Sequence, residues 1–123
     1  MKKAINCETA PAAVGPYSHA NIAGNLVFVS GQLPVKDGKL ETEDISQATK
    51  NCMENISMIL KECGSDLEKI VRCNIYLTDL ALFGEVNEAY GSFFKDNYPS
   101  RVCVEVSALP KGATVEIDCI AAV

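Results

Sequence analysis

The sequence has one histidine, no tryptophan and no long apolar run. With a single histidine and no Cys-x-x-Cys pair, a zinc site would have no local signature. No window approaches the roughly 18 to 20 uninterrupted apolar residues that a membrane-spanning helix needs. The N-terminus reaches Asn6 and Glu8 before any long apolar stretch develops, which is not typical of a signal peptide. We therefore expect a cytoplasmic protein with no metal and no membrane partner.

A basic stripe is missing as well. The formal net charge is -5 and the lysines are scattered along the chain, which argues against nucleic acid as a partner. The 123 residues are 48% hydrophobic and no repeat or linker divides them, so we expect a single domain over residues 1–123. None of the six cysteines form close pairs, and we interpret them as buried free thiols.

Two helices are predicted from apolar residues that recur every three or four positions. The first spans about residues 45–63, with Asp44 as its N-cap, Gln47 at the capping-box position and Gly64 as a left-handed C-cap. The second spans about residues 80–95 and is ended by the proline that follows.

Strand patterns account for most of the remaining chain. Expected strands lie at residues 21–23 and 26–30 around a Gly24-Asn25 turn, and at residues 70–78, 101–109 and 114–123. With two helices for one sheet, both helices are expected on the same face. The sequence thus predicts an α+β two-layer domain.

The far face of this sheet needs a cover. In residues 70–77, Val71, Cys73, Ile75 and Leu77 alternate toward the helices, yet the other set still contains Ile70 and Tyr76. Strands that are apolar on both faces are covered on both faces. No helix is left for the second face, so we predict a homo-oligomer packed sheet against sheet.

Arg101 is one of only two arginines and stands at the head of an apolar strand. A guanidinium is costly to desolvate without a partner, so it meets either a protein carboxylate or an anionic ligand. Alternation along this strand puts the valines on one face of the sheet and Arg101 and Cys103 on the other. We assign Arg101 and Cys103 to the face that packs against another copy of the chain. We expect Glu116, on the neighbouring strand, to share a pocket with them. An ion pair of Arg101 with Glu116 or Glu105 is the equally favoured alternative.

Other polar and aromatic residues have structural explanations by default. His19 follows a turn, with no second titratable group beside it, and is expected at a surface or loop position. The strand end at Ser30-Gly31 allows a ligand to approach the backbone closely, or is simply a turn. Tyr17 and Tyr90 are expected to pack or to line a pocket, and Asn87 to be an exposed helix residue.

Five sequence motifs are spread over almost the whole chain. They are Gly15-Pro16-Tyr17-Ser18, residues 29–34, Val86-Asn87 with Tyr90 and Phe93-Phe94, residues 99–106, and residues 109–112. In this order they closely resemble the Rid family, also called the YjgF/UK114 family. The residues at 101, 103 and 116 place the chain with its RidA subfamily of enamine/imine deaminases.

The resemblance implies a chorismate-mutase-like fold assembled as a homotrimer, with clefts between subunits. It also implies hydrolysis of 2-aminoacrylate, 2-iminopropanoate and related 2-enamino and 2-imino acids to 2-oxo acids and ammonia, without metal or cofactor. Such intermediates damage pyridoxal-phosphate enzymes, so the implied role is metabolite damage control.

Site roles also follow from the resemblance. Arg101 would hold the substrate carboxylate in a bidentate contact, and Glu116, kept ionised near an arginine, would hold the attacking water. Cys103 would line the pocket without forming a covalent intermediate. The other family pocket positions would shape the cleft, some from the adjacent subunit: Tyr17, Ser30, Gly31 and Asn87.

Two other functions compete with the deaminase. One is a non-catalytic trimer that senses carboxylates or acts as a chaperone-like binding module. Glu116 favours catalysis over sensing, because a second carboxylate beside the arginine would hinder anion binding. The other is ribonuclease or translation-inhibitor activity, which the acidic charge balance disfavours.

Overall fold

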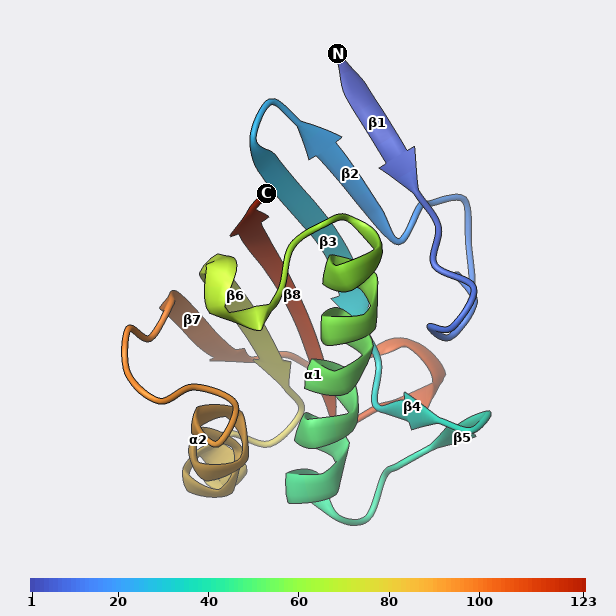
Figure 1. Cartoon of the computed structure of the whole chain (residues 1–123). Coiled ribbons are helices and arrows are strands. Elements are labelled where there is room, and N and C mark those ends of the chain that lie inside the picture. Colours follow the sequence, from blue (N-terminus) through green and yellow to red (C-terminus); the bar gives the residue numbers. More distant parts are fainter.

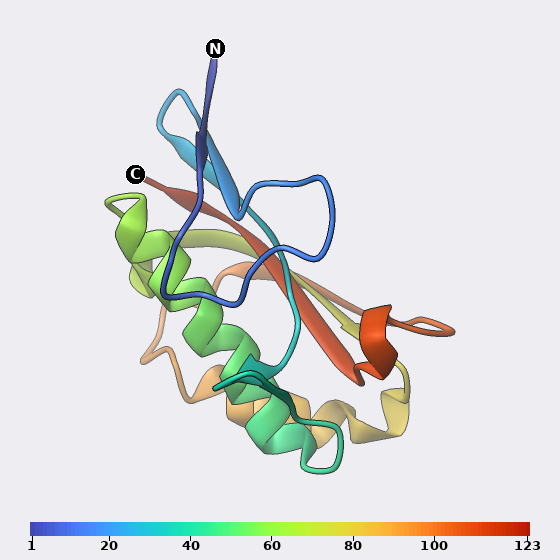
Figure 2. The same cartoon turned by 90° about the vertical axis from the view of Figure 1, so that its right-hand side faces the viewer.

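A six-stranded sheet forms one layer of the molecule and two helices form the other (Figures 1 and 2). This computed structural model describes residues 1–123. It confirms the predicted α+β fold, with both helices on one face of a mixed sheet. Across the sheet the strand order is β1 (Lys2–Ile5), β2 (Ala20–Ala23), β3 (Leu26–Gln32), β8 (Val115–Ala122), β6 (Ile70–Leu77) and β7 (Ser100–Glu105). Only β6 and β7 pair in parallel.

Short elements complete the chain. The two-residue turn at Gly24-Asn25 joins β2 to β3 as predicted, and Gly24 has a φ of +61°. The sequence prediction missed β1 and a small separate hairpin. The hairpin and the 3-10 turns are β4 (Val35–Lys36), β5 (Lys39–Leu40), η1 (Leu67–Lys69), η2 (Leu80–Leu82) and η3 (Pro110–Gly112).

Helix α1 (Ile45–Glu62) begins and ends as the sequence predicts. The Gln47 backbone N–H donates to Asp44 Oδ1 at 3.1 Å, which caps the N-terminus. Gly64 follows the helix with a φ of +77°, a left-handed conformation that glycine adopts easily. The reciprocal half of the capping box was assigned wrongly, because Glu41 accepts from the Asp44 N–H while the Gln47 side chain bonds Asn51. Neither helix is long and apolar enough to cross a membrane.

Helix α2 (Phe83–Gly91) is shorter than the predicted residues 80–95. Its entry is the separate turn η2, capped by Asp79, whose Oδ1 accepts from the Ala81 N–H. The helix ends at Gly91, a poor helix former, and the chain continues in tight turns.

The core lies between α1 and the inner faces of β3, β6 and β8. It is one cluster of 23 buried residues, and it contains five of the six cysteines. A register shift between Ile70 and Arg72 corrects the prediction for β6. Ile70 is buried and Val71 is 51% exposed, the reverse of the expected assignment. A bulge of one residue moves every earlier side chain to the other face, and strict alternation cannot anticipate it.

The second face of the sheet carries no helix (Figure 2). We call it the open face. Its apolar side chains include Phe28, Val102 and Val104, which are 42%, 37% and 40% exposed. This agrees with the expectation that the strands are apolar on both sides.

Candidate active site

Arg101 lies on β7, at the edge of the sheet. It pairs with buried Cys73 of β6, so its side chain shares the helix-facing side of the sheet. Arg101 Nη1 donates to Asn87 Oδ1 of α2 at 2.7 Å. The guanidinium carbon is 5.4 Å from the Phe83 ring centroid and 5.3 Å from that of Tyr90. Helix α2 therefore supplies every contact that the structure gives the charged end of Arg101.

The predicted position of Arg101 relative to Glu116 was wrong. Strand β6 lies between β7 and β8, so the two residues are not on neighbouring strands. Glu116 pairs with Tyr76 on the open face, opposite to the side of Arg101 and Cys103. Alternation sorts residues into two sets but does not say which set faces the helices. An apolar set usually faces the core, yet Val102 and Val104 point outward.

The alternative of an ion pair for Arg101 is also wrong. The one ion pair in the structure joins Lys36 to Glu54 at 4.0 Å. Glu105 instead accepts a hydrogen bond from the Leu80 N–H at 2.8 Å. A half-buried guanidinium with no carboxylate partner keeps donors available for an anion from outside the chain.

Glu116 lies in a second hollow, at the end of β3. This pocket has a volume of about 330 Å³ and is lined by Val14, Tyr17, Ser30, Gly31, Leu33, Pro110 and Glu116. Three predicted pocket residues, Tyr17, Ser30 and Gly31, are therefore brought together with Glu116. Arg101, Cys103 and Asn87 form a separate group on the other side of the sheet.

The pKa of Glu116 is raised, contrary to the expectation that an arginine keeps it ionised. Burial is the main cause, and the nearby Asp118 carboxylate adds to it. Asp118 is itself held in place, because Asn74 Nδ2 donates to Oδ1 at 2.7 Å and Tyr76 Oη donates to Oδ2 at 3.2 Å. A raised pKa makes this carboxylate a stronger base than an ordinary glutamate.

Asp118→Asn is expected to shift the pH dependence of any reaction that uses Glu116 as a base. The substitution removes a negative neighbour, so the pKa of Glu116 falls and the carboxylate form persists to lower pH. The acid limb of kcat/KM against pH should then move to lower pH. A movement to higher pH, or none, would show that Asp118 does not act on Glu116 through its charge.

Gly31 leaves room for the Glu116 carboxylate. A Cβ at this position would lie 2.6 Å from Glu116 Oε2, closer than atoms can approach. The register shift in β3 falls between Val29 and Gln32, so the backbone bulges where Glu116 lies beside it. The predicted close approach at Ser30-Gly31 is thus made by a side chain of the protein itself. Ser30 Oγ is engaged elsewhere and donates to Ser18 O at 2.7 Å.

Gly31→Ala is expected to lower turnover about a hundredfold without unfolding the protein. Gly31 does not have a positive φ, so alanine fits the backbone, and the flexible Glu116 carboxylate is what must move. Gly91→Ala is the matched control, since a Cβ there meets no atom within 4 Å. Thermal melting and a turnover assay test the pair. An unchanged rate for Gly31→Ala would show that the position of Glu116 is not critical.

His19 and Cys103 differ in how well the sequence predicted them. His19 is buried and not at the surface, because Nδ1 accepts from the Cys7 N–H at 2.8 Å and Nε2 lies 2.8 Å from Pro11 O. With Nδ1 accepting, Nε2 carries the proton, and the ring holds the N-terminal segment in place.

Cys103 is half-buried, and burial raises the pKa of its thiol although Arg101 opposes the shift. A thiol that stays protonated is consistent with the expectation that Cys103 forms no covalent intermediate.

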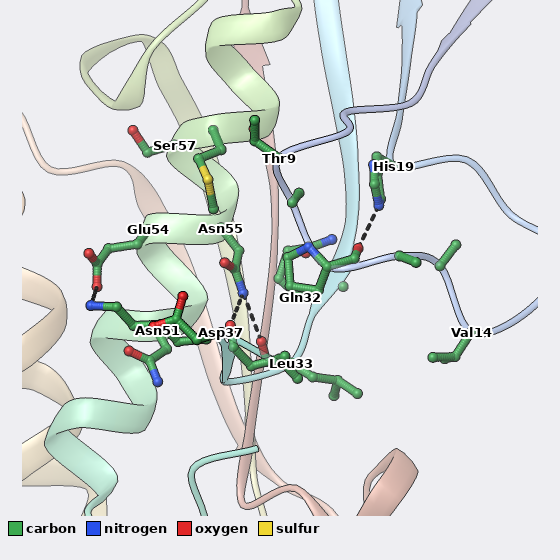
Figure 3. Close-up of a pocket in the computed structure, with 18 of the residues that line it drawn as sticks. Thr9, Val14, His19, Gln32, Leu33, Asp37, Asn51, Glu54, Asn55 and Ser57 are labelled. Carbon is green, nitrogen blue, oxygen red and sulfur yellow. Dashed lines mark hydrogen bonds and ion pairs between the residues drawn. The ribbon is translucent and has the colours of Figure 1, made fainter. Parts of the chain in front are cut away.

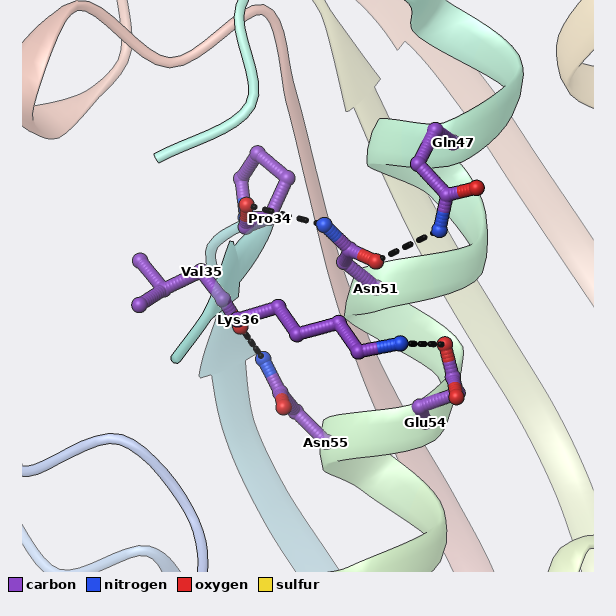
Figure 4. A network of polar contacts seen from close by, with 7 residues as sticks. All are labelled: Pro34, Val35, Lys36, Gln47, Asn51, Glu54 and Asn55. Carbon is purple, nitrogen blue, oxygen red and sulfur yellow. Dashed lines mark hydrogen bonds and ion pairs between the residues drawn. The ribbon is translucent and has the colours of Figure 1, made fainter. Parts of the chain in front are cut away.

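A larger cavity of about 830 Å³ lies between α1 and the N-terminal loop (Figure 3). Its buried amides are already engaged with backbone carbonyls (Figure 4). Asn55 Nδ2 donates to Leu33 O at 3.2 Å and to Val35 O at 3.0 Å, while Asn51 Nδ2 lies 3.5 Å from Pro34 O. These amides hold the segment after β3 against α1, so the structural role explains them.

Fold and geometry define a two-layer α+β protein with an arginine that has no carboxylate partner at the edge of the sheet and a half-buried carboxyl group on the opposite face. The chain belongs to the family described as Endoribonuclease L-PSP, the YjgF/Rid family, whose profile matches residues 7–123. It is 43% identical over 122 residues to the RutC family protein y4sK of Sinorhizobium fredii, covering 98% of this chain and 97% of that protein.

Two further relatives carry more informative names. Human 2-iminobutanoate/2-iminopropanoate deaminase is 35% identical over 123 residues, which cover 98% of this chain and 90% of that protein. The crystal structure of E. coli TdcF with bound serine matches with a TM-score of 0.93 at 36% identity and covers 98% of both chains. Relatives named as imine deaminases support a reactive-intermediate deaminase.

Sequence reasoning missed two contributors to these groups. Phe83 lies in the predicted second helix, but nothing in the sequence indicates that its ring lies near Arg101. Asp118 lies in the predicted last strand, and its spacing of two from Glu116 could have indicated that both share one face.

Proposed function

We propose that this protein hydrolyses 2-imino and 2-enamino acids, such as 2-iminopropanoate and 2-aminoacrylate, to 2-oxo acids and ammonia. The observation that carries the proposal is the half-buried Arg101 guanidinium, which has no carboxylate partner in the chain. All these substrates have a carboxylate next to the reacting carbon, and a guanidinium binds a carboxylate through two parallel hydrogen bonds. The substrate carboxylate would supply the missing anion.

We further propose that the complete site forms between copies of the chain. Arg101, Cys103 and Asn87 lie on the helix side at the edge of the sheet, whereas Glu116, Tyr17, Ser30 and Gly31 lie around the other pocket. A single substrate reaches both groups only if one copy contributes the first and its neighbour the second. The exposed apolar side chains of the open face support packing between copies, and we propose a homotrimer with three such clefts.

The chemistry assigns a role to each group. Arg101 fixes the carboxylate and so places the imine carbon beside Glu116 of the neighbouring copy. Glu116 accepts a proton from water as the water oxygen bonds to that carbon. Glu116 returns this proton to the imine nitrogen, which gives a tetrahedral adduct with one hydroxyl and one amino group. As the C–N bond breaks, the hydroxyl proton passes through Glu116 to the nitrogen, and the 2-oxo acid and ammonia leave. A 2-enamino acid reacts as its imine tautomer. A raised pKa suits a group that both accepts and returns a proton.

The family supports this reaction over binding alone. The human relative bears the name of an imine deaminase, and the E. coli relative holds serine, a small amino acid with the same carboxylate. We propose that the protein acts in the cytoplasm, where it protects pyridoxal-phosphate enzymes from the intermediates that dehydratases release. The family description also names endoribonuclease, but His19 is buried with both ring nitrogens engaged, and no other histidine is available for RNA cleavage.

A coupled assay tests the proposal. A pyridoxal-phosphate dehydratase generates 2-aminoacrylate from serine, and the appearance of pyruvate is followed with and without the purified protein. We expect the protein to accelerate pyruvate formation in proportion to its concentration. Pyruvate binding without acceleration would instead support the carboxylate-sensing module.

A further inference from the structure

Three residues of α2 face the Arg101 guanidinium. Phe83, Asn87 and Tyr90 are spaced at i, i+4 and i+7, so they lie along one side of the helix, beside the edge strand β7 (Figure 1). The hydrogen bond to Asn87 and the two ring contacts come from this side. The arrangement holds the guanidinium in a structure without a ligand.

These contacts leave the Arg101 guanidinium able to bind an anion. Aromatic faces attract a cation without accepting its N–H groups and without cancelling its charge. A carboxylate from the protein in the same place would compete with the substrate. Asn87 uses its oxygen toward Arg101, because a guanidinium only donates, and its Nδ2 group is then left as a further donor. The cluster therefore offers donors and positive charge but no acceptor.

We propose that Phe83 and Tyr90 are positioning residues that hold the Arg101 guanidinium ready for the substrate carboxylate. This inference rests on the proposed function, in which Arg101 binds that carboxylate. An arginine side chain loses much rotamer freedom when it is fixed, and the rings fix it before the substrate arrives. The rings therefore increase affinity without touching the substrate.

The hydroxyl group of Tyr90 does not take part in positioning Arg101. It is buried and has no hydrogen-bond partner, with the Cys73 thiol as a neighbour, and burial raises the pKa of Tyr90. The ring alone faces Arg101.

Phe83 is the better test position, because its side chain is 38% exposed and a change there spares the core. Pyruvate is the probe, titrated calorimetrically into the native protein and into Phe83→Leu and Phe83→Trp. We expect Phe83→Leu to weaken pyruvate binding about three- to tenfold, and Phe83→Trp to retain it. In the turnover assay, Phe83→Leu should raise KM and leave kcat nearly unchanged.

A double-substitution cycle separates positioning from general packing. In an Arg101→Ala background, Phe83→Leu should cause no further loss of pyruvate affinity. The same loss in both backgrounds, or native affinity for Phe83→Leu alone, would overturn the inference and leave the proposed function standing. Native protein that binds pyruvate through Arg101 but does not accelerate imine hydrolysis would instead refute the proposed function only.

Discussion

Arg101→Ala is expected to lower kcat/KM for 2-aminoacrylate hydrolysis about 10² to 10³-fold. The substitution removes a charge-assisted bidentate contact of about 3 to 4 kcal/mol with the substrate carboxylate. The fold should survive, because β7 is an edge strand and the Arg101 side chain is only half-buried. Pyruvate binding should weaken in parallel, since substrate and product share the carboxylate. The measurement is the coupled pyruvate assay together with a pyruvate titration.

Arg101→Lys should recover little of this loss. Lysine keeps the charge but lacks the planar fork that matches a carboxylate, and its ammonium group is not held by ring faces in the same way. Arg72→Lys is the matched control, because Arg72 is the other arginine and points to the opposite side of the sheet. Near-native kcat/KM for Arg101→Ala would disprove the carboxylate anchor, and with it the observation on which the proposed function depends.

Local patterns predicted the elements of this fold better than their arrangement. Periodicity and capping residues located α1 to within one residue, because the Asp44 cap and Gly64 act within a single turn. The pairing of β7 with β6 joins segments far apart in the sequence, and the spacing of residues within either strand does not indicate it. The identities of the site residues came from the motifs, whereas the face on which Arg101 lies required the strand order.

The sequence also failed to predict that the site residues fall into two groups, again because this depends on how the strands pair. Alternation placed Arg101 with Cys103, and this grouping is confirmed by their pairing with Cys73 and Ile75. It also placed Glu116 correctly, on the face opposite to the core, but it did not show that the valines of β7 share that open face while Arg101 lies on the other. The raised pKa of Glu116 was likewise missed, since it depends on burial and on a neighbour whose contact appears only in three dimensions.

Glu116→Gln is expected to lower kcat by about 10² to 10⁴-fold while pyruvate affinity stays within about threefold of native. Glutamine has the size of glutamate but cannot accept the proton of the attacking water. The acid limb of the native pH profile should also disappear, because it reflects protonation of Glu116. In the native protein, turnover is expected to fall as the pH falls through the raised pKa of Glu116.

Glu68→Gln, on the exposed turn η1, is the matched control and should leave turnover unchanged. Separate effects on rate and binding distinguish the enzyme from a sensor. In a sensor that only binds carboxylates through Arg101, the loss of Glu116 would improve anion binding, because a negative charge is removed. Such a sensor would show no turnover in either form. Native turnover in Glu116→Gln would remove this residue from the reaction and leave the water to be activated by another group. Loss of turnover with retained binding would support a reaction in which the two groups, on opposite faces of one sheet, act on the same substrate, as we propose for a site where two copies of the chain meet.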